Sequence, residues 1–199
     1  MQKALDAFNV SIARVEHLAG LHQAIASLTT PAIDSSDLLR AQIVLAVSAL
    51  DFYVHEVTLL GMIEVYAGTR SPTPAFEKYR ISVGAMMAGH LGGGTAWLEA
   101  EIRDRHSFLS FQHPDKIADA IRLFSPVKLW QAVAASLGTD EGTVKSRLRL
   151  IVDRRNKIAH EADLDPSYPG ARWPISEADT AQTRQFLAEL VGVIHAVVV

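Results

Sequence analysis

The sequence of 199 residues contains no cysteine. This absence excludes disulfide bonds, zinc sites built on thiolates and cysteine nucleophiles. A chain without disulfides is typical of a reducing compartment. If the chain is a catalyst, its chemistry must therefore come from histidine, acids, amides, hydroxyls or guanidinium groups.

The sequence also lacks features that would direct it to a membrane. Its first six residues, Met1 to Asp6, contain no apolar segment of the kind found in signal peptides. The most apolar stretch, residues 43–65, is interrupted by polar and charged side chains, which argues against a membrane span. These side chains are Asp51, His55, Glu56 and Glu64. We therefore expect a cytoplasmic protein with no membrane partner.

An excess of positive charge is missing as well, because the formal net charge is −3 at pH 7. A protein coated for non-specific nucleic-acid binding would be strongly basic, so any RNA site here must be local. One dense basic run is present, and it consists of Lys145, Arg147, Arg149, Arg154, Arg155 and Lys157. Taken alone, such a run also fits the solvated face of a helix.

Apolar residues recur at helical spacing along most of the chain, and no stretch alternates as a β-strand does. At 49% hydrophobic residues, the chain can bury a sizeable core as a single domain over residues 1–199. We expect an all-α bundle with long central helices and short inserted helices.

Caps and helix breakers indicate where the helices lie. The expected ranges are 3–28, 35–67, 75–88, 96–110, 115–124, 126–137, a helix from about 140 to 160, and a last helix after residue 176. The glycine-rich residues 89–95 are expected to form a flexible connector. Ser176 and Asp179 have the spacing of a capping box for the last helix. The residues of that helix expected to face the core are Leu187, Leu190, Val191, Ile194 and Val198. The second helix is apolar almost all round, so it should lie at the centre of the bundle.

The penultimate helix ends in the segment Arg154-Arg155-Asn156-Lys157-Ile158-Ala159-His160. At about 100° per residue, Arg155 falls in the middle of an apolar stripe. The stripe consists of Val144, Leu148, Ile151, Val152, Ile158, Ala159 and Ala162. A guanidinium on such a stripe needs a carboxylate partner, an anionic ligand or a cleft that admits one, because it cannot lose its charge.

The second helix carries a narrow polar line at spacings of three, four or seven residues, made up of Asp37, Arg40, Ser48, Asp51, His55 and Thr58. One interpretation is the thin solvent-facing edge of a mostly buried helix. The other is that Asp51 or His55 faces Arg155, because a buried guanidinium needs a partner. Both interpretations stay open at this stage.

The spacing Arg-x4-His, with Asn156 directly after Arg155, resembles the signature of the HEPN superfamily, particularly its RiboL-PSP branch of predicted ribonucleases. The place of the motif, late in an all-helical chain and before an amphipathic last helix, resembles that branch too. The resemblance implies a HEPN-like helical bundle and a metal-independent RNA endonuclease that uses no cofactor. It also implies a homodimer whose interface holds a composite Arg/His site, and products with 2′,3′-cyclic phosphate and 5′-hydroxyl ends.

The residue types suit that chemistry, because RNA carries its own nucleophile in the 2′-hydroxyl. An imidazole, with an ordinary pKa of about 6.5, suits the proton transfers. The planar fork of an arginine matches two phosphate oxygens. We therefore assign Arg155, His160 and Asn156 to catalysis and Asp51 and His55 to its support. The basic residues assigned to RNA binding are Arg154, Lys157 and Arg149.

The motif supplies one histidine per site, which leaves one of the two proton transfers unassigned. A dimer that pairs two motif helices would supply the second histidine. Two other functions remain open: a non-catalytic HEPN module that binds nucleotide or RNA, and a structural dimerisation domain. The resemblance suggests a toxin or an effector of phage defence. The sequence does not identify a protein that would inhibit or activate it. HEPN toxins that are silenced by a nucleotidyltransferase carry a tyrosine where this chain has Ala162.

Overall fold

The computed structural model describes residues 1–30 and 33–199, and it confirms an all-α protein. The helices are α1 (Gln2–Leu28), α2 (Ser36–Tyr66), α3 (Pro74–Glu77), α4 (Val83–Gly92), α5 (Ala96–His106), α6 (Pro114–Arg122), α7 (Leu129–Ser136), α8 (Glu141–His160) and α9 (Glu177–Val198). In the described ranges, the one β-type pairing is an isolated bridge between Leu164 and Arg172.

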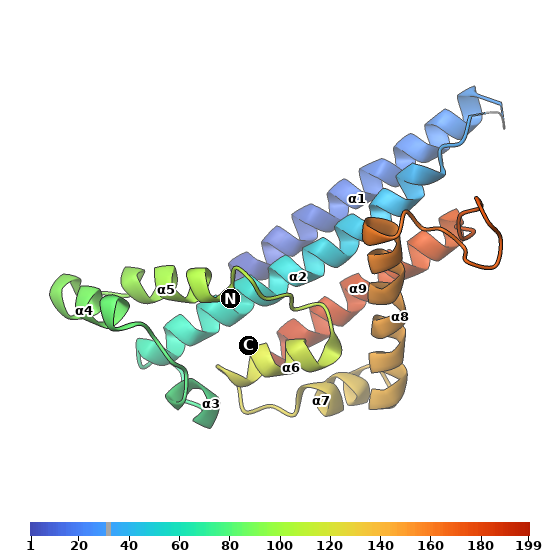
Figure 1. Ribbon diagram of the computed structural model, residues 1–199. Helices are drawn as coiled ribbons and strands as arrows, with labels where there is room; N and C mark the ends of the chain where they lie inside the picture. The colour runs from blue at the N-terminus through green and yellow to red at the C-terminus, as the bar shows by residue number, and fades with distance from the viewer. Residues whose placement is uncertain (31–32) are drawn as a thin grey trace.

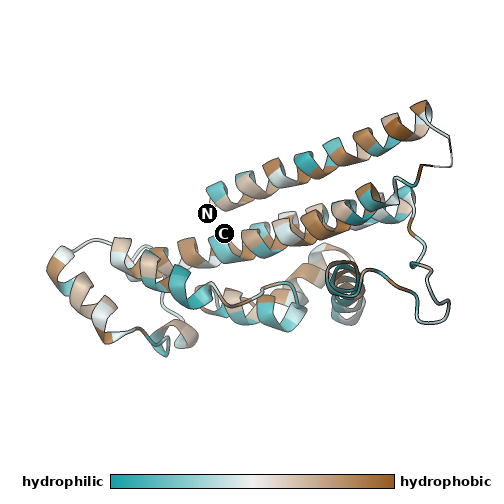
Figure 2. Ribbon diagram, turned by 45° about the horizontal axis from the view of Figure 1, so that its top comes forward, coloured by the Kyte–Doolittle hydropathy of each residue, from teal (hydrophilic) through white to brown (hydrophobic). Residues whose placement is uncertain are grey.

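The three longest helices, α1, α2 and α9, lie side by side, with α2 against both of the others (Figure 1). Helix α8 crosses them steeply, and the α4–α5 pair extends from the opposite end of α2. This arrangement follows from hydropathy, because α2 is apolar on most of its surface and must be covered on several sides (Figure 2). The expectation of a central second helix is confirmed.

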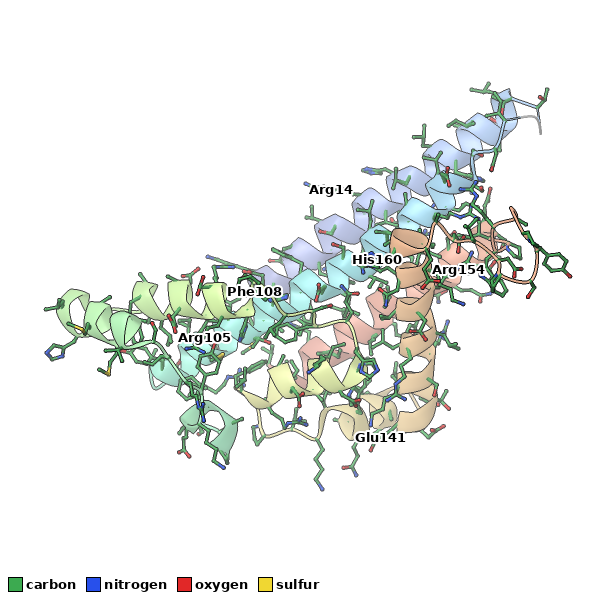
Figure 3. All side chains as sticks on the ribbon, viewed as in Figure 1. Arg14, Arg105, Phe108, Glu141, Arg154 and His160 are labelled. Atoms are coloured by element: carbon green, nitrogen blue, oxygen red, sulfur yellow. The ribbon has the colours of Figure 1, made fainter. Side chains whose placement is uncertain are left out.

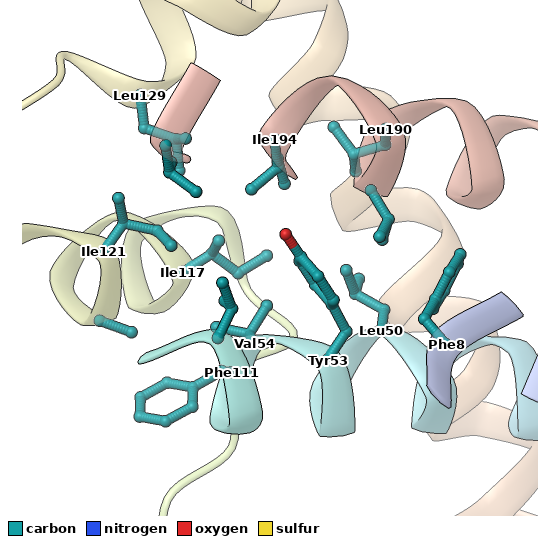
Figure 4. Close-up of a cluster of buried hydrophobic side chains, with 14 of the residues drawn as sticks. Phe8, Leu50, Tyr53, Val54, Phe111, Ile117, Ile121, Leu129, Leu190 and Ile194 are labelled. Atoms are coloured by element: carbon teal, nitrogen blue, oxygen red, sulfur yellow. The ribbon is translucent and has the colours of Figure 1, made fainter. Parts of the chain in front are cut away.

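The core forms where α2, α6 and α9 meet, and Tyr53 lies in it fully buried (Figure 4). The Tyr53 hydroxyl lies 3.2 Å from the Nδ1 atom of His195. Burial raises the pKa of Tyr53 well above its usual range. Among the described residues, α2 is the one helix long and apolar enough to cross a membrane by length and composition. About half of its most apolar window, 56%, is buried inside the protein.

Helix α8 begins where the sequence predicts. Asp140 caps it, because its carboxylate accepts a hydrogen bond from the backbone N–H of Thr143 at 2.9 Å. The buried stripe is shorter than predicted, since it covers Val144, Leu148, Ile151 and Val152 and then stops. Beyond this point Ile158 is half-buried, Ala159 is exposed, and Ala162 lies outside the helix. The last turns of α8 therefore leave the core.

The helix boundaries predicted from the sequence were least accurate between α2 and α8. The expected helix over 75–88 is two helices, α3 and α4, because Ser82 starts a new one by accepting a hydrogen bond from the N–H of Ala85. The expected connector at 89–95 is helical as far as Gly92. Helix α5 ends at His106 and not at 110, and α7 starts at Leu129 and not next to Pro126.

The last helix follows its prediction closely. The Ser176 hydroxyl accepts from the N–H of Asp179 at 3.1 Å, and the Asp179 carboxylate accepts from the N–H of Ser176 at 3.1 Å. This reciprocal pair is the predicted capping box. The residues expected to face the core are all buried, and they are Leu187, Leu190, Val191, Ile194 and Val198.

Candidate functional site

The motif residues lie at the C-terminal end of α8, where the helix has left the core. His160 is the last residue of the helix and is exposed, and Asn156 lies one turn earlier. Figure 3 shows His160 and Arg154 at this end of α8, in front of α2 in that view. In the described ranges, no hydrogen bond or ion pair holds the His160 side chain, so its imidazole is open to a ligand.

Arg155 is half-buried beside these residues, and its bonding is incomplete. Its Nη1 atom donates a hydrogen bond to the Asn156 Oδ1 atom at 3.1 Å. Its Nε atom is buried and has no hydrogen-bond partner. None of the ion pairs among the described residues involves Arg155. The charge of this guanidinium is therefore not neutralised by a carboxylate in the described part of the chain.

Of the two interpretations of the polar line, the pairing of Arg155 with Asp51 or His55 is not found among the described residues, and Asp51 has other partners. Its carboxylate accepts hydrogen bonds from the backbone N–H of Phe111 at 2.6 Å and from the Nε2 atom of Gln112 at 3.0 Å. The His55 Nε2 atom lies 3.8 Å from Asp51. Asp51 therefore holds the loop between α5 and α6 against α2.

His55 belongs to an aromatic cluster under the same loop. Its ring centroid lies 4.5 Å from that of Phe111 and 6.3 Å from that of His106. The Tyr79 hydroxyl lies 3.3 Å from the Nε2 atom of His106. Burial, with a contribution from His55, lowers the pKa of His106 to about 4, so this imidazole is neutral at neutral pH. These contacts explain the positions of His55 and Asp51 without a role at the motif.

Arg154, which we had assigned to RNA binding, has a structural position instead. Its Nη2 atom donates to the Asp163 Oδ2 atom at 2.9 Å, to the carbonyl of Trp173 at 3.3 Å and to that of Pro174 at 3.1 Å. Its Nη1 atom lies 2.9 Å from the Asp163 Oδ1 atom, outside hydrogen-bond geometry. Burial lowers the pKa of the Arg154 guanidinium, and the charge of Asp163 opposes that effect.

A second arginine reaches the same carboxylate from α2. The Nε atom of Arg40 donates to the Asp163 Oδ2 atom at 2.6 Å. Its other nitrogens donate to the Ser36 hydroxyl at 2.7 Å and to the carbonyl of Trp173 at 2.9 Å. Asp163 is 1% exposed. We name the three residues Arg40, Arg154 and Asp163 the arginine clamp; it joins α2, α8 and the loop before α9.

The other two residues assigned to RNA binding lie at the surface of α8. The Lys157 ammonium lies 4.9 Å from the centre of the Trp173 ring, a cation–π distance. The Arg149 Nε atom lies 3.4 Å from the Nε2 atom of His113, and its Nη2 atom lies 3.8 Å from the Asp115 carboxylate. Both cations remain partly exposed, so either could still contact an anionic ligand.

The polar line of the second helix is therefore not one functional surface. Arg40 and Thr58 are buried, Asp37 and Ser48 are exposed, and Asp51 binds a loop. No group of three or more His, Asp or Glu residues in the described ranges could hold a metal ion. Arg155, Asn156 and His160 lie in the last turns of α8, on the predicted helix, and Arg155 is hydrogen-bonded to Asn156.

Sequence reasoning missed the residues that anchor this end of α8, which are Arg40, Asp163 and Trp173. The one signal for Asp163 was that an acidic residue stands in the loop shortly after the motif, nine residues after Arg154. Trp173 is far from the motif in sequence and carried no signal. Arg40 belongs to the polar line of the second helix, but nothing in the sequence links it to Asp163.

No family model, no curated protein and no solved structure matches this chain.

Proposed function

We propose that this protein is a metal-independent RNA endonuclease of HEPN type, with Arg155, Asn156 and His160 as its catalytic residues. The observation that carries the proposal is the state of Arg155. It is half-buried, its Nε atom has no partner, and no carboxylate in the described ranges pairs with it. A permanent cation in that position is suited to bind an anion such as a phosphate.

Each residue has a role that its position supports. Arg155 would bind the scissile phosphate and stabilise the charge of the phosphorane. Asn156, already bonded to Arg155, would fix the direction of the guanidinium. The exposed imidazole of His160 would transfer a proton, either from the 2′-hydroxyl or to the leaving 5′-oxygen. Attack by the 2′-hydroxyl breaks the bond to the 5′-oxygen, so the products are a 2′,3′-cyclic phosphate and a 5′-hydroxyl.

The second proton transfer needs a second histidine, and we propose that another copy of the chain supplies it. The end of α8 suits such a contact because Ile158 is half-buried and Ala159 is exposed there. A groove of about 540 Å³ between α1 and α2 is a second uncovered apolar surface, with Val10 54%, Leu45 47% and Phe52 48% exposed. A symmetric dimer would bring two Arg155 and two His160 side chains into one cleft.

The decisive experiment is incubation of total cellular RNA with the purified protein in EDTA, followed by end-group analysis. We expect fragments with cyclic phosphate ends from the wild type, and a loss of at least about 100-fold in His160→Ala. His90→Ala is the matched control, because His90 is also an exposed histidine in the last turn of its helix. Its cleavage should equal that of the wild type.

Two outcomes would contradict the proposal. Cleavage by His160→Ala close to that of the wild type would remove His160 from the mechanism. No cleavage of any RNA, with retained binding of RNA or nucleotide that Arg155→Ala abolishes, would favour a non-catalytic binding module. A role as toxin or in phage defence rests on the HEPN resemblance alone. Growth arrest on expression of the wild type but not of His160→Ala would support it. The expected cytoplasmic location rests on the sequence, which has no cysteine.

A further inference from the structure

We propose that Asp163 is a positioning residue for His160, and that it acts by fixing the turn in which α8 ends. This proposal rests on the ribonuclease function proposed above. It concerns three residues that the motif does not contain, the arginine clamp of Arg40, Arg154 and Asp163.

The turn after His160 has a conformation that its residues do not favour. Ala162 has a φ of +53° and Asp163 a φ of +58°, and both values lie in the left-handed region. This conformation is unfavourable for alanine, whereas aspartate adopts it more readily. At Ala162 it persists only where the surrounding structure requires it. This residue, two positions after His160, therefore needs a strong local cause.

The clamp supplies that cause. The Asp163 carboxylate is almost fully buried, so it is stable as an anion only while cations remain next to it. Arg40 and Arg154 provide them, at 2.6 Å and 2.9 Å from the Oδ2 atom. One cation belongs to α2 and the other to α8, so Asp163 can meet both only if the chain turns back immediately after the helix.

The backbone of the turn is fixed from both sides of His160. The N–H groups of Glu161 and Asp163 both donate to the carbonyl of Lys157, at 3.0 Å each. The carbonyl of Asp163 accepts from the N–H of Trp173 at 2.9 Å. His160 therefore lies between an anchored carbonyl and an anchored carboxylate, while its side chain forms no hydrogen bond or ion pair in the described ranges. The clamp fixes the backbone from which the imidazole extends, and a reacting group needs such a fixed position.

Asp163→Asn tests this role, because asparagine keeps the size of the side chain and tolerates the left-handed backbone but removes the charge. Asp153→Asn is the matched control, since Asp153 lies exposed on α8 and its side chain forms no hydrogen bond or ion pair in the described ranges. Arg40→Gln is a second variant that weakens the clamp from α2. Circular dichroism establishes that each variant is folded.

Two measurements do not depend on catalysis. Hydrogen exchange of the Glu161 and Asp163 amides should become about tenfold faster or more in Asp163→Asn and Arg40→Gln, while amides of α1 and α9 change by less than about twofold. The His160 ring signals in NMR spectra should broaden in the same two variants and remain sharp in Asp153→Asn. Unchanged exchange and unchanged ring signals would overturn the proposal, whether or not the protein cleaves RNA.

The third measurement is cleavage. We expect kcat to fall about tenfold or more in Asp163→Asn, with KM changed by less than about threefold, because binding of the phosphate by Arg155 is kept. A normal kcat together with a loosened turn would overturn the positioning role. If the wild type cleaves no RNA, the proposed function fails, and exchange and ring signals alone decide whether Asp163 fixes His160.

Discussion

Arg154 and Arg155 are neighbours in the chain but lie in opposite surroundings. Arg154 donates hydrogen bonds to a buried carboxylate and two backbone carbonyls. In the described ranges, the Arg155 side chain forms one hydrogen bond, to the amide oxygen of Asn156. Protein groups satisfy the first cation, and the second lacks a carboxylate in the described ranges. A cation that is already paired stabilises the fold, while a half-buried cation without a counter-charge is available to a ligand. The difference teaches that position on an apolar stripe does not by itself identify a structural arginine.

The sharpest way to break this comparison is to remove Arg155. If it serves catalysis, Arg155→Ala should lower RNA cleavage by about 100- to 1000-fold, the usual cost of losing one group that stabilises transition-state charge. The free energy of unfolding, from urea titration, should change by less than about 1 kcal/mol. Arg80→Ala, at an exposed arginine of the loop between α3 and α4, is the control. A destabilised protein with normal cleavage would reverse the roles that we assign to the two arginines.

The arginine clamp gives the opposite expectation. Arg40→Ala should lower the free energy of unfolding by about 3 kcal/mol, because it leaves the buried Asp163 with one of its two cations. Chemical denaturation followed by circular dichroism measures this loss. A change below 1 kcal/mol would show that Arg154 alone compensates the charge, and the clamp would then be a much weaker element than its geometry indicates.

The same contrast between enclosed and open groups extends to histidines, and pH tests it. Since the pKa of His106 is lowered to about 4, the unfolded chain takes up this proton first as pH falls. Its contribution to stability is complete above about pH 7 and is lost as pH falls through 6.5 toward 4. At pH 5 the loss should be about 2 kcal/mol. In His106→Gln this part of the pH dependence of unfolding should disappear; an unchanged profile would assign it to other groups.

The smallest expected effect concerns Lys157, a cation that lies against an aromatic ring, whereas Arg154 contacts a carboxylate and Arg155 an amide. Lys157→Met should lower the stability by about 0.5–1 kcal/mol, through loss of the cation–π contact with Trp173. If Lys157 also contacts a phosphate, the slope of log affinity for RNA against log salt should fall by about one. Fluorescence anisotropy over a salt series measures that slope. An unchanged slope would leave Lys157 with its contact to Trp173 alone.

Local signals in the sequence predicted the framework of the fold well. The cap at Asp140, the capping box of Ser176 and Asp179, and the core-facing residues of α9 were all correct because each depends on residues within a turn or two. The errors fell where helices are short. Around Ser82 and Lys128 the choice between continuing and restarting a helix depends on small differences in capping, which tertiary packing decides.

The part of the candidate site that lies on a single helix could be predicted from the sequence. Arg155, Asn156 and His160 could be placed together because helical periodicity fixes their relation. The partners of Asp51 could not, since they come from a loop sixty residues away. The contacts of Arg154 with Asp163 were equally hidden. These contacts depend on the position of Asp163 in three dimensions. The left-handed turn that creates this position contains no glycine, so the sequence does not indicate it.

The arginine clamp also has a consequence for the order of events during synthesis. Arg40 and Asp163 are 123 residues apart, and both clamp arginines bond to the carbonyl of Trp173. Because a growing chain folds from its N-terminus, α1 and α2 can pair long before this contact becomes possible. The end of α8 would then acquire its final geometry only after residue 173 has left the ribosome. If the protein cuts RNA as we propose, this delay should keep the nascent chain inactive beside its own messenger.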